Sequence, residues 1–207
     1  QNTYDRKLIE IRQAKDIDEQ AELAREIDYK YFVEVIGLPA ARSIQDKIIN
    51  MCKYFRVADL RIMLQPDFLV NFRAGSACNS PKNVINSRAW VQTAINISRS
   101  METQPYNAEK LKRCLPELRS MTVRKPEEFL PRMRTIFAEC GIAFVLLPHL
   151  KNSGINGAVK WLTEDRVVLA MNNRGLDADK FWFSLFHEIK HVFQQKIKTV
   201  FISSTVE

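Results

Sequence analysis

The sequence lacks an apolar run of about 18 residues, the length that a membrane-spanning helix needs. It also lacks a basic stretch leading into an apolar one at the N-terminus, so no signal peptide is indicated. Internal repeats and low-complexity tracts are absent, and 46% hydrophobic with 27% charged residues is typical of a globular chain. We therefore expect a soluble, cytoplasmic protein of one or two domains. The first residue is Gln1 rather than Met, which suggests a piece of a longer protein.

Cysteine is scarce, and its spacing does not fit a metal site. The four cysteines lie 26, 36 and 26 residues apart, with no C-x-x-C pair. A zinc site built from cysteine needs closely spaced pairs, and a disulfide framework would accompany a secretion signal. We expect scattered reduced thiols at Cys52, Cys78, Cys114 and Cys140.

Positive charge is in excess, with 31 Lys and Arg against 24 Asp and Glu, but it is unevenly distributed. Residues 1–34 carry 6 basic and 9 acidic residues, whereas residues 110–134 carry 8 and 3. A helix that binds DNA needs a basic surface, because neutralising phosphates supplies most of the affinity. We therefore expect that residues 1–34 do not bind DNA. The basic stretch is expected to be a solvated helix face, with an acidic partner or nucleic acid as the alternative.

The first 36 residues contain an uninterrupted helical pattern. Residues 4–36 lack Pro and Gly, and apolar side chains recur every three or four positions among charged ones. This spacing predicts one long amphipathic helix that packs through a single face. The side chains expected on that face include Ile17, Ala24, Ile27 and Tyr31.

After Gly37 the pattern predicts shorter helices and then strands. One helix should follow Ser43 as its N-cap, and another should cover residues 127–140, directly after Pro126. Short apolar runs beyond residue 141 indicate strands, and residues 163–165 should form a hairpin turn. The other expected helices cover residues 84–101, 108–119 and 181–195, and the expected strands cover residues 142–147, 157–162, 167–171 and 199–202.

This order of elements predicts an α+β fold. We place a domain boundary in the loop that contains Gly75 and the run 76–81. Residues 1–78 would form a helical connector region. Residues 79–207 would form a second domain with a small sheet and a core helix, incomplete at its C-terminus.

One motif carries chemistry, the H-E-x-x-H sequence of His187, Glu188 and His191. Residues four apart lie on the same face of a helix, so both imidazoles can converge on one metal ion. The motif predicts a zinc site with the two histidines as ligands and Glu188 as the catalytic base for an activated water. The alternative is that both histidines only pack on or cap the helix. The apolar side chains expected to bury this helix and keep the site partly dry are Phe181, Trp182, Leu185, Phe186, Ile189, Val192 and Phe193.

A catalytic zinc site usually has a third protein ligand. Only 16 residues follow His191, and Glu207 is the one carboxylate among them. Asp177 and Asp179 precede the helix and are expected to be charges at its N-terminus, and His149 is expected to be a loop or surface residue. We therefore expect the third ligand outside this sequence, or no third ligand, and weak zinc binding by these 207 residues.

Residues 126–202 resemble the ImmA/IrrE family of metallopeptidase-like domains. The family's order of helix, strand, hairpin and zinc helix is matched by the segments FLPRMRTIFAECGIAFVLLPHL, INGAVKWL and RVVLAMNNRGLDADKFWFSLFHEIKHVF. The aromatic lead-in FWFSLFHE and the preceding Gly-Ala strand are more specific than H-E-x-x-H alone. From residue 43 onward, KYFRVADL, RAWVQTAINIS and PYNAEKLKRCLPELRSMT are similar to longer versions in which this domain ends a bacterial regulator or a HigA-like antitoxin.

The resemblance implies a cytoplasmic prokaryotic regulator with a zincin-like domain, in which His187 and His191 bind zinc and Glu188 is catalytic. It also implies an Xre-type helix-turn-helix upstream, through which alone the protein would bind DNA. The sequence departs from the family in three ways. The helix-turn-helix is not in it, Lys190 stands where Gly is usual, and the Glu-rich segment that supplies the third ligand is missing.

Two functions follow as hypotheses. The first is a zinc-dependent endopeptidase that cleaves a partner protein such as a repressor or toxin, with the exposed edge of strand 157–162 binding the substrate. The second is a non-catalytic regulatory module that binds a toxin, a ligand or its own copy as a homodimer. The intact Glu188 favours the first and the missing third ligand favours the second. We lean toward a regulator with a peptidase-like domain.

Overall fold

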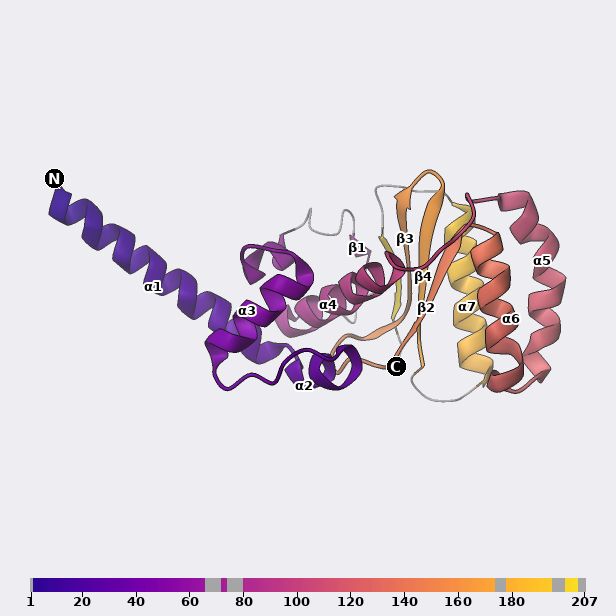
Figure 1. Cartoon of the computed structure of the whole chain (residues 1–207), viewed down its shortest axis with the longest axis horizontal. Helices are drawn as coiled ribbons and strands as arrows, with labels where there is room; N and C mark the ends of the chain where they lie inside the picture. Colours follow the sequence, from indigo (N-terminus) through magenta and orange to yellow (C-terminus); the bar gives the residue numbers. More distant parts are fainter. Residues whose placement is uncertain (1, 66–71, 74–79, 174–177, 195–199, 205–207) are drawn as a thin grey trace.

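The computed structural model describes residues 2–65, 72–73, 80–173, 178–194 and 200–204. The fold is α+β, as the sequence predicts, with helices on both faces of one mixed sheet (Figure 1). No helix within these ranges is long and apolar enough to cross a membrane. The α-helices are α1 (Asn2–Glu26), α2 (Tyr29–Tyr31), α3 (Ile44–Phe55), α4 (Pro81–Ser98), α5 (Ala108–Ser120), α6 (Pro126–Glu139) and α7 (Ala178–Phe193). A π-helical turn, η1 (Phe32–Ile36), and two 3-10 turns, η2 (Leu60–Leu64) and η3 (Met121–Val123), complete the helical elements described.

The sheet has the strand order β1-β5-β3-β4-β2. Strands β2 and β4 are parallel, β1 and β5 are parallel, and β3 is antiparallel to both of its neighbours. The expected hairpin is confirmed, because β3 and β4 pair up to Thr163 and Arg166. The expectation of an exposed edge at residues 157–162 is wrong, because β4 and β5 bond to the two sides of β3. The strands are β1 (Phe72–Arg73), β2 (Ile142–Leu147), β3 (Ile155–Thr163), β4 (Arg166–Asn172) and β5 (Val200–Ser204).

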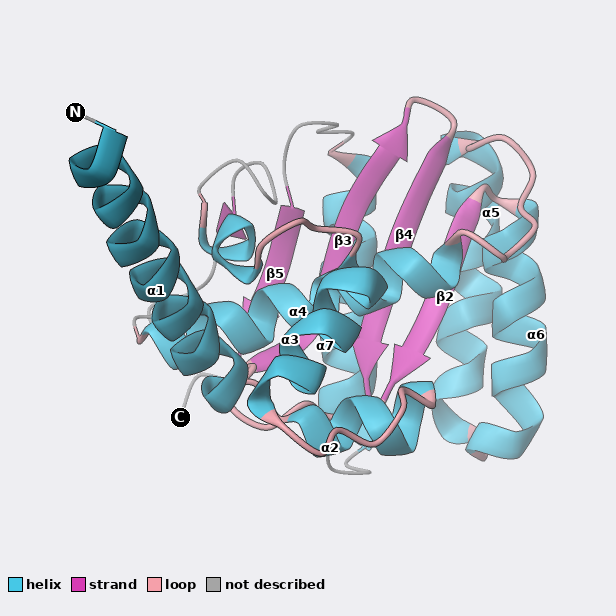
Figure 2. Cartoon of the chain, turned by 60° about the vertical axis from the view of Figure 1, so that its left-hand side comes forward, coloured by secondary structure: helices cyan, strands magenta, loops and turns pink. Residues whose placement is uncertain are grey.

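Side chains that alternate along the strands divide the buried residues between two hydrophobic cores. The first, here the α4 core, lies between the sheet and the helices α1, α3 and α4. The second, the α7 core, lies between the sheet and the helices α5, α6 and α7. In Figure 2 the helices α3 and α4 lie in front of the sheet, and α5 and α6 lie behind it. From the strands, Val145, Ala158, Val168 and Ala170 join the α4 core, and Phe144, Val159, Trp161 and Leu169 join the α7 core.

Local sequence signals set several helix starts as expected. The N-cap of α3 is Ser43, whose hydroxyl accepts from the Asp46 amide while the Asp46 carboxylate accepts from the Ser43 amide, each over 3.1 Å. This reciprocal capping satisfies donors that the helix itself leaves unpaired. Helix α6 begins at Pro126, as Pro in a first turn favours. Helix α4 begins three residues before the expected start, because Ser80 caps it ahead of Pro81.

The first 36 residues form mainly one helix, as their pattern predicts, but this helix ends earlier than the pattern predicts. Helix α1 ends at Glu26, and α2 and η1 follow a break at Ile27 and Asp28. The amide of Asn86 on α4 donates to the Glu26 carbonyl over 2.9 Å and accepts from the Asp28 amide over 3.4 Å. A side chain distant in sequence thus replaces hydrogen bonds within the helix, and local periodicity cannot reveal it.

Packing of this region follows the expectation only near its end. Ala24, Ile27 and Tyr31 are buried as expected, whereas Ile17 is 52% exposed, so its expected packing is wrong. Figure 1 gives the reason, because the N-terminal part of α1 extends away from the rest of the chain. Among the described side chains of α1, those that reach the α4 core lie at its C-terminal end.

The expected boundary between residues 78 and 79 lies outside the described residues. The α4 core contains residues from both sides of it, among them Phe32, Met51 and Trp90. These side chains pack together with the sheet residues of the same core. The division into residues 1–78 and 79–207 stays a prediction.

Candidate metal centre

Helix α7 carries the H-E-x-x-H motif and has one buried and one exposed face. Phe183, His187 and Lys190 recur at helical spacing on the exposed face, where Phe183 is 77% exposed. The opposite face packs in the α7 core, as the sequence predicts, and the ring of Trp182 stacks on Phe186. The core members from α7 are Trp182, Leu185, Ile189 and Val192, with Phe181, Phe186 and Phe193 packed against them.

The two imidazoles converge, as the i, i+4 spacing predicts. The Nε2 atoms of His187 and His191 lie 3.0 Å apart, and the ring centroids lie 4.6 Å apart with an interplanar angle of 84°. A hydrogen bond between two imidazole nitrogens requires one of them to carry the proton and the other to accept it. The Nδ1 of His191 lies 3.3 Å from Oε1 of Gln194, so a neighbouring residue orients this ring. Their role as metal ligands stays a prediction.

The histidine pair fits part of a zinc site. Two nitrogens that each lie about 2.1 Å from a tetrahedral zinc ion are about 3.4 Å apart, so small side-chain rotations would suffice to accept the ion. Among the described residues, no group of three or more His, Cys, Asp and Glu side chains is arranged to hold a metal ion. The described part of the chain therefore offers two nitrogen ligands on an exposed helix face.

Glu188 lies on the buried side of the motif. Its side chain is 0% exposed, in contrast to the exposed His187 beside it. The carboxyl group packs against Gly157 of β3, where a Cβ atom would lie 2.7 Å from Cγ of Glu188 and 3.0 Å from its Oε1. The residues of the motif thus lie in two environments. The two histidines lie toward the exposed face of α7, and the Glu188 carboxylate packs against the sheet.

Gly157 is a site residue that sequence reasoning missed. It lies inside β3 and pairs with Met171 of β4 and Ser203 of β5. A glycine inside a strand weakens the strand and often marks a close approach of another group. That signal was present in the sequence, but it did not indicate which group approaches. The structure identifies the group as the side chain of Glu188.

The remaining candidate ligands lie apart from the pair or outside the described residues. Asp177 and Glu207 belong to segments that the structure does not describe. Asp179 lies exposed in the first turn of α7, as expected for an N-terminal charge. His149 is half-buried in the loop between β2 and β3, where its Nδ1 lies 3.1 Å from Nδ2 of Asn172.

The cysteines and the basic stretch behave as ordinary structural features. Cys52, Cys114 and Cys140 are free thiols, and Cys78 lies outside the described residues. The basic residues of the 110–134 stretch are exposed or half-exposed on α5, on α6 and at the two positions between η3 and α6, as expected for a solvated face. Some are paired: Arg132 binds Glu117 over 2.7 Å, and its hydrogen bonds and charge lower the pKa of the Glu117 carboxyl. An acidic partner or nucleic acid on this face stays a prediction.

No family model, curated protein or solved structure matches this chain.

Proposed function

We propose that this chain contains a zincin-like domain of the ImmA/IrrE kind, part of a cytoplasmic prokaryotic regulator or antitoxin that acts on a partner protein. The observation that carries the proposal is the convergence of His187 and His191, whose Nε2 atoms lie 3.0 Å apart with Glu188 between them in sequence. This arrangement is what an H-E-x-x-H helix requires of its side chains. The partner is a protein substrate or a toxin.

In this proposal the two imidazoles hold a zinc ion on the exposed face of α7. When bound, the ion would supply Lewis acidity toward a peptide carbonyl and lower the pKa of a coordinated water to about 7. Glu188 holds and moves the proton, and its carboxylate is fixed against β3 by the close approach to Gly157. Gly157 therefore acts as a positioning residue for the base.

A second candidate is a non-catalytic regulatory module that binds a toxin, a ligand or its own copy. The complete burial of Glu188 favours it, because a general base must reach the proton that it abstracts. In this case the histidine face would serve recognition, and Glu188 would serve the packing of α7 on the sheet. The two candidates share the same helix and differ in what Glu188 does.

Zinc calorimetry on the chain and on single histidine variants tests the proposed metal centre. We expect weak binding that is lost in His187→Ala and in His191→Ala, because a zinc ion needs both imidazoles to gain from chelation. His149→Ala is the matched control, since it removes the third histidine of the sequence and should leave zinc binding unchanged. Zinc binding that survives loss of His187 and His191 would contradict the proposal.

Glu188→Gln separates the two candidates. An enzyme should keep zinc and lose cleavage of a mixed peptide library, because the variant retains the shape of the side chain and removes the base. Cleavage is followed by mass spectrometry of the library with and without a chelator. If the zinc-loaded chain cleaves no peptide although its zinc binding depends on the histidine pair, the result favours the non-catalytic regulatory module over the enzyme.

A further inference from the structure

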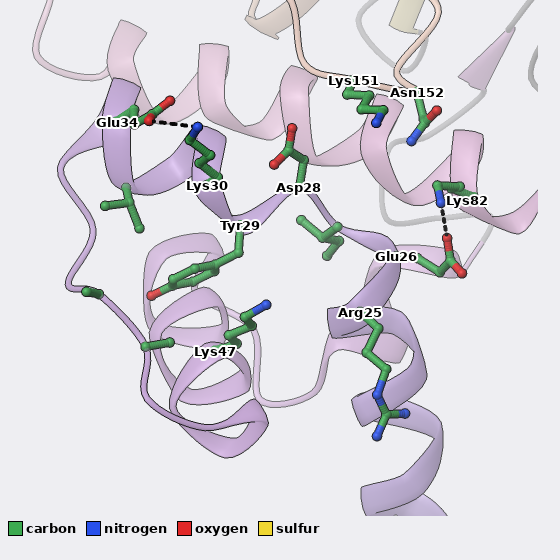
Figure 3. Close-up of a pocket in the computed structure, with 14 residues that line it drawn as sticks. Arg25, Glu26, Asp28, Tyr29, Lys30, Glu34, Lys47, Lys82, Lys151 and Asn152 are labelled. Atoms are coloured by element: carbon green, nitrogen blue, oxygen red, sulfur yellow. Dashed lines mark ion pairs between the residues drawn. The ribbon is translucent and has the colours of Figure 1, made fainter.

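Two surface hollows beside the N-terminal helices differ in their charge. The larger, of about 730 Å³, is lined by residues of α1, α2, α3 and α4 and by the loop that holds Lys151 (Figure 3). Two of its lysines already have partners, because Lys30 lies 3.4 Å from Glu34 and Lys82 lies 3.0 Å from Glu26. Carboxylates thus lie among its cations and would repel an anionic ligand.

The smaller hollow, of about 510 Å³, has cations and no carboxylate in its lining. It lies where the C-terminal ends of α3 and α4 meet, and it exposes Lys53, Arg56 and Arg99. Within the described part of the chain, none of these three cations forms an ion pair. Its lining is completed by Tyr54, Asn96 and Ser100.

Hydrogen bonds hold the two helix ends of this hollow together. Nδ2 of Asn96 on α4 donates to the carbonyl of Tyr54 on α3 over 2.9 Å. Oδ1 of Asn96 accepts from Nε2 of Gln92 over 3.0 Å, which fixes the orientation of the amide. The spacing between the cations on α3 and Arg99 is therefore set by a bond between the two helices.

Arg56 has a backbone conformation that glycine adopts more easily. It is the C-cap of α3, with φ 57° and ψ 45° in the left-handed region. Helices often end in this conformation, usually with Gly, because a side chain is disfavoured there. The arginine at this position is exposed at the C-terminal end of the helix.

The three cations of the smaller hollow carry more positive charge than is needed to balance the partial negative charges of the two helix C-termini. Each helix C-terminus is equivalent to about half a negative elementary charge, so α3 and α4 together offset about one of the three cations. We propose that the remaining charge binds the diphosphate group of a small ligand. Guanidinium groups match pairs of phosphate oxygens, and the volume lies within the range of about 300–1,000 Å³ typical of small-molecule sites. The hollow lies on the α4 side of the sheet, so this inference does not rest on the function proposed for α7.

Calorimetry with inorganic pyrophosphate at low salt tests the inference on the full 207-residue chain. We expect binding that weakens about tenfold in Arg99→Gln, because a charge-assisted hydrogen bond is lost. Arg56→Gly should weaken binding similarly while leaving the urea midpoint unchanged or higher, since Gly suits the left-handed C-cap. Arg134→Gln on α6 is the matched control with the same change of charge, and it should bind like the parent chain.

Three results would overturn the inference. One is the absence of pyrophosphate binding by the parent chain at low salt. Another is an equal loss in Arg134→Gln, which would mean that net charge alone attracts the anion. The third is tighter binding of a short DNA duplex that depends on Arg56 and Arg99, because the site would then recognise a nucleic acid backbone instead.

Discussion

The helices α4 and α7 cover opposite faces of the same sheet by different means. Helix α7 packs through apolar side chains, and Glu188 is the one charged residue of this helix that is buried. Helix α4 buries polar side chains as well, and three of them, Asn86, Ser87 and Arg88, bind main-chain atoms of distant segments. Arg88 donates to the carbonyls of Met63 and Gln65 over 2.6 and 2.9 Å. The buried polar residues of α4 are Asn86, Ser87, Arg88, Thr93 and Ser98.

This difference shows that the two faces of one sheet can hold their helices in different ways. Apolar packing positions the helix on one face, and buried hydrogen bonds position the helix on the other. Buried hydrogen bonds add little net stability but specify one arrangement, because an unpaired buried group is costly. Ser87 donates to the Ser153 carbonyl over 2.5 Å, and Asn86 donates to the Glu26 carbonyl, so α4 joins the loop after β2 to the end of α1. Helix α4 therefore organises the N-terminal helices, and α7 presents the histidine pair.

The largest effect is expected at the centre of the α4 core. Trp90 is fully buried, and its Nε1 donates to the Pro148 carbonyl over 3.1 Å. Trp90→Ala should lower the free energy of unfolding by about 3–5 kcal/mol, because it leaves a large cavity and removes one of the two hydrogen bonds to the Pro148 carbonyl. Urea unfolding measures this loss, and Val123→Ala at a position 89% exposed should change the free energy by less than about 0.5 kcal/mol. Equal effects at both positions would contradict the assignment of Trp90 to the core.

Gly157→Ala tests whether the α7 face depends on close packing around Glu188. The added Cβ would lie 2.7 Å from Cγ of Glu188, so we expect a loss of about 1–3 kcal/mol in unfolding free energy from overpacking. In a Glu188→Ala background the same change should cost much less, because the crowded atoms are gone. A double-mutant cycle in urea measures the coupling. Independent, additive effects would show that the two residues do not interact.

The sequence predicted those parts of this comparison that depend on local spacing. The buried stripe of α7, the N-cap of α3 at Ser43 and the β3–β4 hairpin each follow from residues close together in the chain. The convergence of His187 and His191 is predictable for the same reason, since four residues bring a helix around to the same face.

The sequence could not predict features that depend on distant contacts. The break after Glu26 depends on Asn86, sixty positions away. The internal position of β3 depends on β5, which follows α7 in the sequence. The burial of Glu188 follows from Gly157 on another element. A periodic pattern predicts the structure of one helix or strand at a time. Contacts with distant residues can change that structure, and the pattern does not reveal them.

Asn86→Ala should weaken the link between α4 and the end of α1 without disturbing α7. The variant loses the hydrogen bonds to the Glu26 and Lys82 carbonyls, so we expect a loss of about 1–2 kcal/mol in unfolding free energy. Hydrogen exchange should become faster at residues 27–31, while exchange in α7 stays unchanged. Faster exchange spread evenly over both helices would mean that the two faces of the sheet are not separately stabilised.

The smallest expected effect is a change of stability with pH at the ion pairs of Arg61. This residue of η2 binds Asp16 and Glu19 of α1 and also Asp59. Burial raises the pKa of Asp59, but the hydrogen bonds and charge of Arg61 outweigh this effect and leave the pKa below its usual value. A carboxyl whose pKa is lowered by folding contributes stability above its unfolded pKa of about 3.9, and loses it as the pH falls through the folded value. The contact between Asp59 and Arg61 should therefore weaken below about pH 4.

Asp59→Asn provides the control for this pH dependence. Between pH 6 and pH 3 the urea midpoint should fall slightly more in the parent chain than in the variant. Only the parent chain has a carboxyl at this position that becomes protonated. The difference should be small and should shrink further at high salt, since the side chain of Arg61 is 34% exposed and its ion pairs are screened. The histidine pair on α7 is present in both proteins, so it cancels in the comparison. Identical midpoints for the two chains at pH 3 and at pH 6 would show that the ion pair of Asp59 with Arg61 does not stabilise the fold.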